Sequence, residues 1–422
     1  IDEVGLIMSA YKKFFELTDE IEEAMLHNVL PESGRRIVDF LRTKNENYSY
    51  DPESKRYFIN SFYPSFPGHA WSRAVRDFYH IAVHKKRIPI QADIVVTGKC
   101  QCRCWHCFRA KNKDVQMLDL ETIKHCFSSL YDLGTATVGI TGGEPMLHPD
   151  ILEIIKAIPD GIEGQLYTTG HNIDKKFVSE IKHTNLTRCI ISLDHYQGDK
   201  ADELRHYPGA FKEALTAIEA LTDANIYTAI TVCITNSLLK EGEIQKYFDF
   251  VETLGINEIR IVMPIPQGNL EGKDFSHLYC DAIKFVKDFK KEHFSSAGVP
   301  AILNFCEFES PDYMGCSAGA HYLAINNDGA VTPCVAVPLS FGNIFKEDLK
   351  DIFERMEKFF PISGRICYGK RSGRVISRNN INTTKRPLPE DISLNVAEQC
   401  SISSDTSAFF KCFDVEERGQ AV

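Results

Sequence analysis

The sequence predicts an α/β protein built on a partial barrel of six strand–helix units. Short apolar, β-branched runs alternate with runs of helical period over residues 89–300, as in a parallel sheet with helical crossovers. Polar and thiol side chains directly follow several of these runs, and (β/α) barrels carry their active sites at the carboxyl ends of the strands. No G-x-G-x-x-G follows the first run, which argues against a dinucleotide-binding open sheet.

The predicted units follow one another in order. The first strand, Ala92 to Val96, is short and apolar, and Asp119 is a suitable N-cap for the helix after it. Further strands are expected at residues 137–141, 165–168, 189–193, 227–234 and 258–263. Helices are expected at residues 118–133, 150–158, 175–182, 210–224, 242–254 and 275–293. Each helical run repeats apolar residues at the spacing of one buried face.

Two regions flank this core. Residues 1–88 form a mainly helical extension, with a helical stretch from Leu6 to Leu26 and a polar hairpin-like piece from Tyr48 to Phe58. An aromatic and proline-rich run follows at residues 62–71. We expect it to pack between extension and barrel, with a substrate mouth as the alternative. The expected organisation is therefore an N-terminal extension (1–88), a barrel (89–300) and a cysteine-rich domain (301–422).

Composition limits the functional classes. A net charge of −10 argues against nucleic acid as the main partner. No apolar run approaches the ~20 residues that span a bilayer, so no transmembrane segment is expected. The 14 cysteines gather in two zones instead of spreading as a disulfide framework. This clustering fits metal sites in a reducing compartment, so a cytoplasmic location is expected.

The first cysteine zone is a short loop after the first strand. Cys100, Cys104 and Cys107 form the pattern C-x3-C-x2-C. Three thiolates are fewer than the four ligands that a closed zinc site or an electron-transfer [4Fe–4S] cluster takes. A cluster held by three thiolates keeps one iron open to bind a small molecule. A zinc knuckle with Cys102 or His106 as fourth ligand is the alternative.

A second motif, Gly142-Gly143-Glu144-Pro145, follows the second strand. Paired glycines let the backbone approach a ligand closely, and the adjacent carboxylate can pair with an ammonium group. Alone, this motif is common turn chemistry. One strand–helix unit after the three cysteines, it makes a specific combination.

Together, the cysteine loop and the G-G-E-P motif resemble the radical S-adenosylmethionine (radical SAM) superfamily. In that superfamily the open iron binds the methionine part of SAM, and one electron yields a 5′-deoxyadenosyl radical. The resemblance implies a SAM-binding [4Fe–4S] cluster on the three cysteines and an external flavodoxin or ferredoxin as reductant. It implies that the amino group of SAM is held by Gly142, Gly143 and Glu144. Cys102 is additional to the pattern, and we expect an idle surface thiol or an alternative ligand.

Further SAM contacts are implied at the strand ends. Thr168 ends the third strand and Ser192 the fourth, and hydroxyl groups there suit the ribose and carboxylate of SAM. Arg205 follows the fourth strand, where related enzymes place a basic residue against the SAM carboxylate. Capping or packing is the alternative for each residue. No residue is assigned as catalytic.

The second cysteine zone lies in residues 301–422. The piece Cys316-x12-Gly329-x4-Cys334 resembles the opening of the SPASM domain, which carries auxiliary clusters in many radical SAM enzymes. The usual dense C-x2-C-x5-C-x3-C run is absent, so a shortened, twitch-like domain with one auxiliary [4Fe–4S] cluster is expected. The expected ligands are Cys306, Cys316, Cys334 and Cys367. Cys400 or Cys412 in place of Cys367 or Cys306 is one alternative, and separate buried thiols are another.

A basic segment lies within this second zone. Residues 365–386 contain seven basic residues and no acidic one. We expect a solvated loop, with an anion site as the alternative.

The sequence therefore predicts an iron–sulfur enzyme, an oxidoreductase or transferase, that cleaves SAM reductively and abstracts hydrogen from its substrate. The incomplete cysteine set favours a small-molecule or lipid-precursor substrate. A maturase acting on a ribosomally made peptide or protein is the alternative, and a non-catalytic iron–sulfur electron carrier is a remote one.

Overall fold

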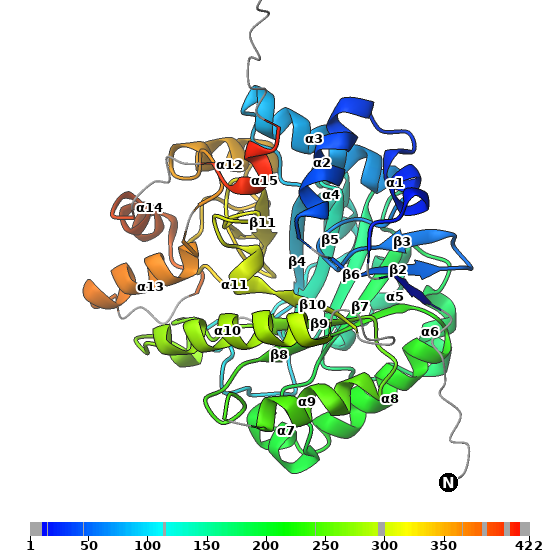
Figure 1. The fold of residues 1–422 in the computed structure, drawn as a ribbon. Helices are drawn as coiled ribbons and strands as arrows, with labels where there is room; N and C mark the ends of the chain where they lie inside the picture. The colour runs from blue at the N-terminus through cyan, green and yellow to red at the C-terminus, as the bar shows by residue number, and fades with distance from the viewer. Residues whose placement is uncertain are drawn as a thin grey trace, which may run out of the picture.

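The computed structural model describes residues 11–413, except residues 15, 45, 113–114, 241, 294–299, 365, 382–385 and 401–405. Within these residues, the centre of the molecule is a nine-stranded sheet in the order β10-β9-β8-β7-β6-β5-β4-β11-β12 (Figure 1). Strands β4 to β11 run parallel, and β12 pairs antiparallel with β11. In the described chain the end strands β10 and β12 do not pair with each other, so the barrel is partial.

All six predicted strands are present. They are β4 (Gln91–Thr97), β5 (Thr137–Gly142), β6 (Glu163–Thr168), β7 (Leu186–Ser192), β8 (Tyr227–Cys233) and β9 (Glu258–Val262). The helices of this region are α4 (Leu120–Asp132), α5 (Ile151–Lys156), α6 (Lys175–Ile181), α7 (Gly198–Arg205), α8 (Ala210–Asp223), α9 (Glu243–Glu252) and α10 (Ser276–His293). Sequence analysis missed α7 and a further parallel strand, β10 (Ala301–Asn304), which pairs with β9.

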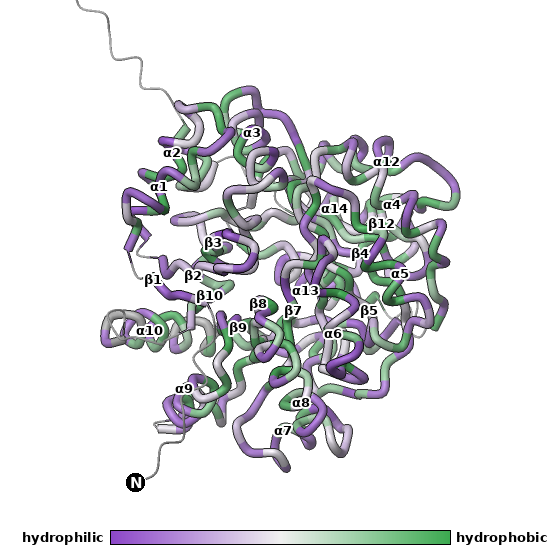
Figure 2. The backbone as a smooth tube through the Cα atoms, turned by 90° about the vertical axis from the view of Figure 1, so that its right-hand side faces the viewer, coloured by the Kyte–Doolittle hydropathy of each residue, from purple (hydrophilic) through white to green (hydrophobic). Residues whose placement is uncertain are grey.

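Local sequence explains where these elements begin and why they stay buried. Asp119 caps α4, since its side chain accepts a hydrogen bond from the Thr122 amide at 2.7 Å. Asp174 caps α6 in the same way. Figure 2 shows strands β7 and β8 as mostly hydrophobic. Part of their apolar side chains belongs to one core that extends into the C-terminal region, and Ile190, Tyr227 and Ala229 belong to a separate, smaller cluster. Burying apolar residues from both faces of a parallel sheet is what stabilises such a fold.

In its described residues, the N-terminal extension contains a small antiparallel sheet and three helices. Its elements are β1 (Lys12–Phe14), α1 (Asp19–Leu26), α2 (Pro31–Arg42), β2 (Tyr48–Asp51), β3 (Arg56–Phe58) and α3 (His69–His84). The predicted hairpin is confirmed by the pairing of β2 with β3. The predicted helix from Leu6 to Leu26 is wrong where β1 pairs with β2. Its first residues, 6–10, lie outside the described residues.

The aromatic and proline-rich run closes the amino end of the barrel. Ser61, just before the run, donates two hydrogen bonds, at 2.5 and 2.7 Å, to the Glu258 carboxylate at the start of β9. Ser65 binds Glu163 at the start of β6 in the same way, and Arg188 donates to Glu163 at 2.5 Å. Aromatic rings of the run are buried around these polar groups, as expected for packing.

The C-terminal region continues the barrel sheet. It contains α11 (Phe305–Phe308), β11 (Tyr322–Ile325), β12 (Val331–Thr332), α12 (Leu349–Arg355), α13 (Tyr368–Arg378), α14 (Glu390–Glu398) and α15 (Ala408–Lys411). Because β11 pairs with β4, the second cysteine zone is attached directly to the strand that leads into the first. Within the described ranges, no helix is long and apolar enough to cross a membrane.

Candidate active site

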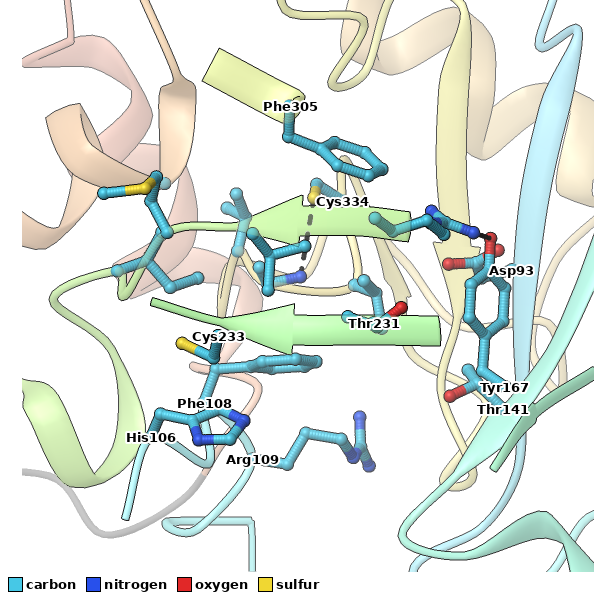
Figure 3. A pocket seen from close by; sticks show the side chains of 18 of the residues that line it. Asp93, His106, Phe108, Arg109, Thr141, Tyr167, Thr231, Cys233, Phe305 and Cys334 are labelled. Atoms are coloured by element: carbon cyan, nitrogen blue, oxygen red, sulfur yellow. Dashed lines mark hydrogen bonds between the residues drawn. The ribbon is translucent and has the colours of Figure 1, made fainter. Parts of the chain in front are cut away.

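A cavity of about 1340 Å³ lies inside the partial barrel, and both cysteine zones line it. Figure 3 shows Asp93, Tyr167 and Thr141 at one end of the cavity and His106, Phe108 and Cys233 at the other. Every predicted site residue is among its lining residues: Cys100, Cys104, Cys107, Gly142, Gly143, Glu144, Thr168, Ser192, Arg205, Cys306, Cys316, Cys334 and Cys367. The two alternative ligands lie elsewhere in the described chain. Cys400 contacts the Tyr368 hydroxyl, and Cys412 packs against the N-terminal extension.

The first cysteine loop is held from two sides. On one side, the Arg103 amide donates to the carbonyl oxygen of Arg205 at 3.0 Å. On the other, Asn269 donates from its backbone amide to the Cys107 carbonyl oxygen at 3.1 Å and from its side chain to the Cys104 carbonyl oxygen at 2.8 Å. A Cβ on the neighbouring Gly268, at φ +59°, would lie 2.1 Å from the Cys107 carbonyl oxygen. Glycine is therefore required here for both its conformation and its size.

Cys102 is buried in the loop, which corrects the expectation of a surface thiol. It shares hydrogen bonds with Cys100 and Cys104. The hydrogen bond with Cys102, assisted by the nearby Arg205 guanidinium, lowers the pKa of Cys104 to about 6. A thiol with such a pKa is largely a thiolate at neutral pH, the form that binds iron.

The second glycine of the G-G-E-P motif joins that motif to the cysteine loop. A Cβ on Gly143 would lie 2.2 Å from the Lys99 carbonyl oxygen, so no larger residue fits without moving the backbone. The same carbonyl accepts a hydrogen bond from the Glu144 amide at 2.7 Å. The contact fixes the two motifs relative to each other.

The Glu144 side chain is fully buried and anchored within the protein. One carboxylate oxygen accepts hydrogen bonds from the Thr168 hydroxyl at 2.5 Å and the Met146 amide at 3.2 Å. The other accepts from the amide and hydroxyl of Thr169 at 2.8 and 2.7 Å. Burial raises the pKa of Glu144, and these donors oppose that rise. The threonines at the end of β6 thus orient the carboxylate at the cavity wall.

Arg205 is also buried and already has a protein partner. Its guanidinium lies 2.7 Å from the Asp194 carboxylate and 3.5 Å from the Cys104 sulfur. Although burial acts to lower it, the pKa of Arg205 is raised, chiefly because of Asp194. Asp194 also accepts a hydrogen bond from the Cys233 amide at 3.0 Å. Sequence analysis did not identify this ion pair.

The second set of cysteines receives backbone hydrogen bonds. The Tyr368 amide points at the Cys316 sulfur at 3.4 Å, and the Ala336 amide at the Cys334 sulfur at 3.5 Å. Cys367 precedes α13, and a hydrogen bond from Cys316 lowers the pKa of Cys367 to about 6. Amide donors aimed at sulfur stabilise thiolates, so this donor set fits an iron–sulfur cluster.

The two cysteine sets lie toward opposite ends of one strand pair. The first follows the carboxyl end of β4. Cys316 precedes β11, whose first residue, Tyr322, is paired with Gln91 at the amino end of β4. Six residue steps along β4 correspond to about 20 Å. The cavity between these ends is therefore flanked by a cysteine set on each side.

Four polar side chains form a layer inside the barrel that sequence analysis did not assign. The Tyr322 hydroxyl donates to Asp93 at 2.5 Å, and Arg260 donates to the Tyr167 hydroxyl at 3.3 Å. One carboxylate oxygen of Asp93 and the Nε of Arg260 are buried without a hydrogen-bond partner among the described residues. Burial raises the pKa of Asp93 to about 6. An Asp within the apolar run Ala92 to Val96 was the available sequence signal.

Comparison with known families decides what this architecture is. The model of the radical SAM superfamily matches residues 94–251, and that of the SPASM iron–sulfur cluster-binding domain matches residues 316–369. The chain belongs to the radical SAM superfamily. The SPASM match contains Cys316, Cys334 and Cys367, and it confirms the expected SPASM-like domain after the barrel.

Known radical SAM proteins resemble much of this chain. AdoMet-dependent heme synthase of Methanosarcina barkeri is 24% identical over 288 residues, which are 63% of this chain and 82% of that protein. The subtilosin biosynthesis protein AlbA of Bacillus subtilis is 26% identical over 271 residues, or 63% of this chain and 60% of AlbA. Streptococcus suis SuiB bound to precursor peptide SuiA has the same fold, with a TM-score of 0.55 and 18% identity over 67% of this chain and 69% of SuiB.

This radical SAM chain is an enzyme, as its curated relatives are. A radical SAM enzyme with a SPASM domain uses a [4Fe–4S] cluster, SAM and an auxiliary iron–sulfur cluster. The donor chemistry described above suits these groups, because each cysteine set contains one thiol whose pKa is lowered to about 6, Cys104 in the first and Cys367 in the second, beside hydrogen-bond donors. Burial raises the pKa of the other thiols of the second set. The zinc-knuckle alternative is therefore set aside.

Proposed function

We propose that Cys100, Cys104 and Cys107 hold the SAM-binding cluster and that Cys306, Cys316, Cys334 and Cys367 hold the auxiliary cluster. Residues 89–300 would form the SAM-binding barrel, and residues 301–422 the auxiliary region. Residues 1–88 would close the amino end of the barrel. The observation that carries this proposal is the single cavity lined by both cysteine sets and the G-G-E-P motif. An external flavodoxin or ferredoxin reductant and a cytoplasmic location remain predictions.

In this proposal SAM and its cluster, when bound, would supply a 5′-deoxyadenosyl radical, and the auxiliary cluster would be an acceptor for one electron. The chain's own residues would orient these bound groups and shield them. The backbone of Gly142 and Gly143 and the anchored Glu144 carboxylate would receive the amino group of SAM. Ser192 and Thr168 would provide hydroxyl groups near its ribose and carboxylate. Arg205, held by Asp194 beside Cys104, would favour negative charge on the cluster thiolates and on the SAM carboxylate.

The proposed substrate is a segment of polypeptide, from which the enzyme would remove hydrogen. Support comes from AlbA, named for bacteriocin biosynthesis, and from the structure of SuiB with its precursor peptide. A cavity of about 1340 Å³ also exceeds the ~300–1,000 Å³ of ordinary small-ligand sites, so it has room beyond SAM. This changes the emphasis of the sequence analysis, which favoured a small molecule.

The test uses reconstituted enzyme with dithionite, SAM and short peptides encoded beside its gene. Mass spectrometry would follow 5′-deoxyadenosine and the peptide together. The expected result is one peptide that loses two hydrogen masses while 5′-deoxyadenosine forms. If 5′-deoxyadenosine forms but every such peptide stays unchanged, the peptide assignment is wrong.

A small polar molecule is the second candidate, and the buried layer of Asp93 and Arg260 favours it. These side chains offer one unused acceptor and one unused donor inside the barrel. The heme synthase relative also matches over most of its own length. Product formation from a low-molecular-weight fraction, with no change in any peptide, would select this candidate.

A further inference from the structure

A second, smaller hollow adjoins the main cavity. Its volume is about 350 Å³, and it lies between α13 and the segment before α10, two elements that are neighbours in Figure 1. Pro264 and Lys370 line both hollows, so the two are continuous. We call this hollow the basic groove. It is lined by Pro264, Pro266, Gly272, Lys273, Asp274, Phe275, Lys370, Gly373, Arg374, Ser377 and Arg378.

The groove concentrates positive charge on a protein of net charge −10. Four of its lining residues are cationic, Lys273, Lys370, Arg374 and Arg378, against the single carboxylate of Asp274. Lys273, Arg374 and Arg378 are exposed. In the part of the chain that the structure describes, neither Lys273 nor Arg374 makes an ion pair. Lys273 and Arg374 therefore lack a counter-charge among the described residues, while Arg378 donates a hydrogen bond to the neutral Gln399 side chain.

The wall of the groove is fixed by close packing. The Gln267 side chain donates to the Gly369 carbonyl at 3.0 Å, and this contact is buried. A Cβ on Gly373 would lie 2.9 Å from the Pro266 carbonyl oxygen. Helix α13 is thus held against the loop that follows β9, so its cations keep a defined spacing.

The spacing of the cations on α13 indicates which kind of ligand fits the groove. Lys370, Arg374 and Arg378 are four residues apart on α13, so they form one stripe with a step of about 6 Å. Along an extended peptide, side chains on one face repeat at every second residue, or about 6.6 Å. A single phosphate would match only one step of the stripe, whereas an extended peptide follows it.

We propose that the basic groove binds an extended segment of the substrate in which acidic residues alternate with other residues. This inference rests on the proposed peptide substrate and deepens it. The inner end of the groove is Lys370, which also lines the main cavity, so a bound segment would lead the rest of the peptide toward both cysteine sets. The basic residues of the segment 365–386 that line the groove thereby serve as an anion site rather than a solvated loop.

The test measures binding without SAM, using reconstituted full-length protein and fluorescein-labelled peptides. One peptide, Gly-Glu-Ser-Glu-Ser-Glu-Gly, has an acidic residue at every second position. Its scramble, Gly-Ser-Glu-Glu-Glu-Ser-Gly, has the same composition. Fluorescence anisotropy at low salt should show tighter binding of the alternating peptide. Affinity should fall as salt rises, because exposed charges are screened.

Variants locate the site. Arg374→Gln should weaken binding of the alternating peptide about threefold, and Arg374→Glu about tenfold. Arg378→Gln should act like Arg374→Gln. The control is Lys212→Gln, which removes an exposed cation on α8 and should leave the affinity unchanged.

Each of the following results would overturn the proposal: no binding of the alternating peptide, equal binding of the scramble, affinity insensitive to Arg374, or tighter binding of a uridine hexanucleotide. Binding of flavodoxin that depends on Arg374, without binding of the peptide, would instead make the groove a reductant site and would also overturn it. Since SAM is absent, the outcome does not depend on radical chemistry. Loss of 5′-deoxyadenosine formation would contradict the proposed function and leave this binding result standing.

Discussion

Replacing Arg205 with alanine should destabilise the fold strongly. The Arg205 side chain is 9% exposed and that of Asp194 is 0% exposed, with 2.7 Å between their charged atoms. Arg205→Ala leaves the Asp194 carboxylate buried without its counter-charge. Removing one partner of a buried ion pair costs about 3–5 kcal/mol. The free energy of unfolding should fall by that amount.

A double-mutant cycle separates the ion pair from simple loss of packing. Asp194→Asn keeps an oxygen for the Cys233 amide but removes the charge. The double variant Arg205→Met with Asp194→Asn should recover most of the stability lost in Arg205→Ala, because neither buried charge remains. The control is Arg42→Ala, whose side chain is 45% exposed and pairs with Glu22, and its cost should be below about 1 kcal/mol.

The assay is urea unfolding of the cluster-free protein followed by circular dichroism, with iron content measured after reconstitution. Arg205→Ala should also lower occupancy of the first cluster, since Arg205 contacts the Cys104 sulfur and its carbonyl oxygen holds the cysteine loop. An unfolding free energy equal to that of the Arg42 control would refute the structural argument. Stable protein that bound SAM poorly would instead indicate that Arg205 acts mainly as a SAM ligand.

Three further predictions test other parts of the site. Replacing all three loop cysteines with alanine should abolish 5′-deoxyadenosine formation. About four of about eight irons should remain, held by the auxiliary set, and a variant without iron would contradict the assignment of that set as cluster ligands. Gly268→Ala should lower iron in the first cluster, because its Cβ would lie 2.1 Å from the Cys107 carbonyl; Gly255→Ala, at φ +68° with nothing within 4 Å, is the matched control and should keep its iron. Asp93→Asn should gain stability over the native chain as pH rises from about 4 to 6, by about 3 kcal/mol at the plateau. In this window Asp93 ionises in the unfolded chain but stays protonated in the folded one, where its pKa is about 6, so the folded native chain loses stability and the Asn variant does not. If the unfolding free energies of the two chains had the same pH dependence, burial would not raise the pKa of Asp93.

Most of the barrel could be predicted from sequence because its signals are local. Apolar strands and capped helices repeat in order, and the cysteine loop and G-G-E-P motif have fixed spacings. All thirteen predicted site residues line the cavity, and the roles assigned to them stay predictions. The failures have a different origin. Strand β10 has only four residues, too few for a clear period, and β1 forms where a helical pattern was expected.

Contacts between side chains on different helices and strands could not be predicted from the sequence. Asp194 and Arg205 meet because β7 and α7 end at the same side of the barrel, and the separation of eleven residues gives no such signal. The layer of Asp93, Tyr167 and Arg260 joins residues from three different strands. The buried position of Cys102 likewise depends on how its loop folds over the barrel mouth.

The pairing of β11 with β4 has a consequence for solubility as well as for chemistry. Strand β4 has a central apolar run, Ile94 to Val96, and β11 occupies backbone groups on its outer edge. A chain cut before β11 would present that edge unpaired, and an exposed apolar edge strand recruits other strands and aggregates. The C-terminal region thus protects the outer edge of β4, and a truncation that removed Cys334 and Cys367 together with β11 would also expose a site for intermolecular pairing.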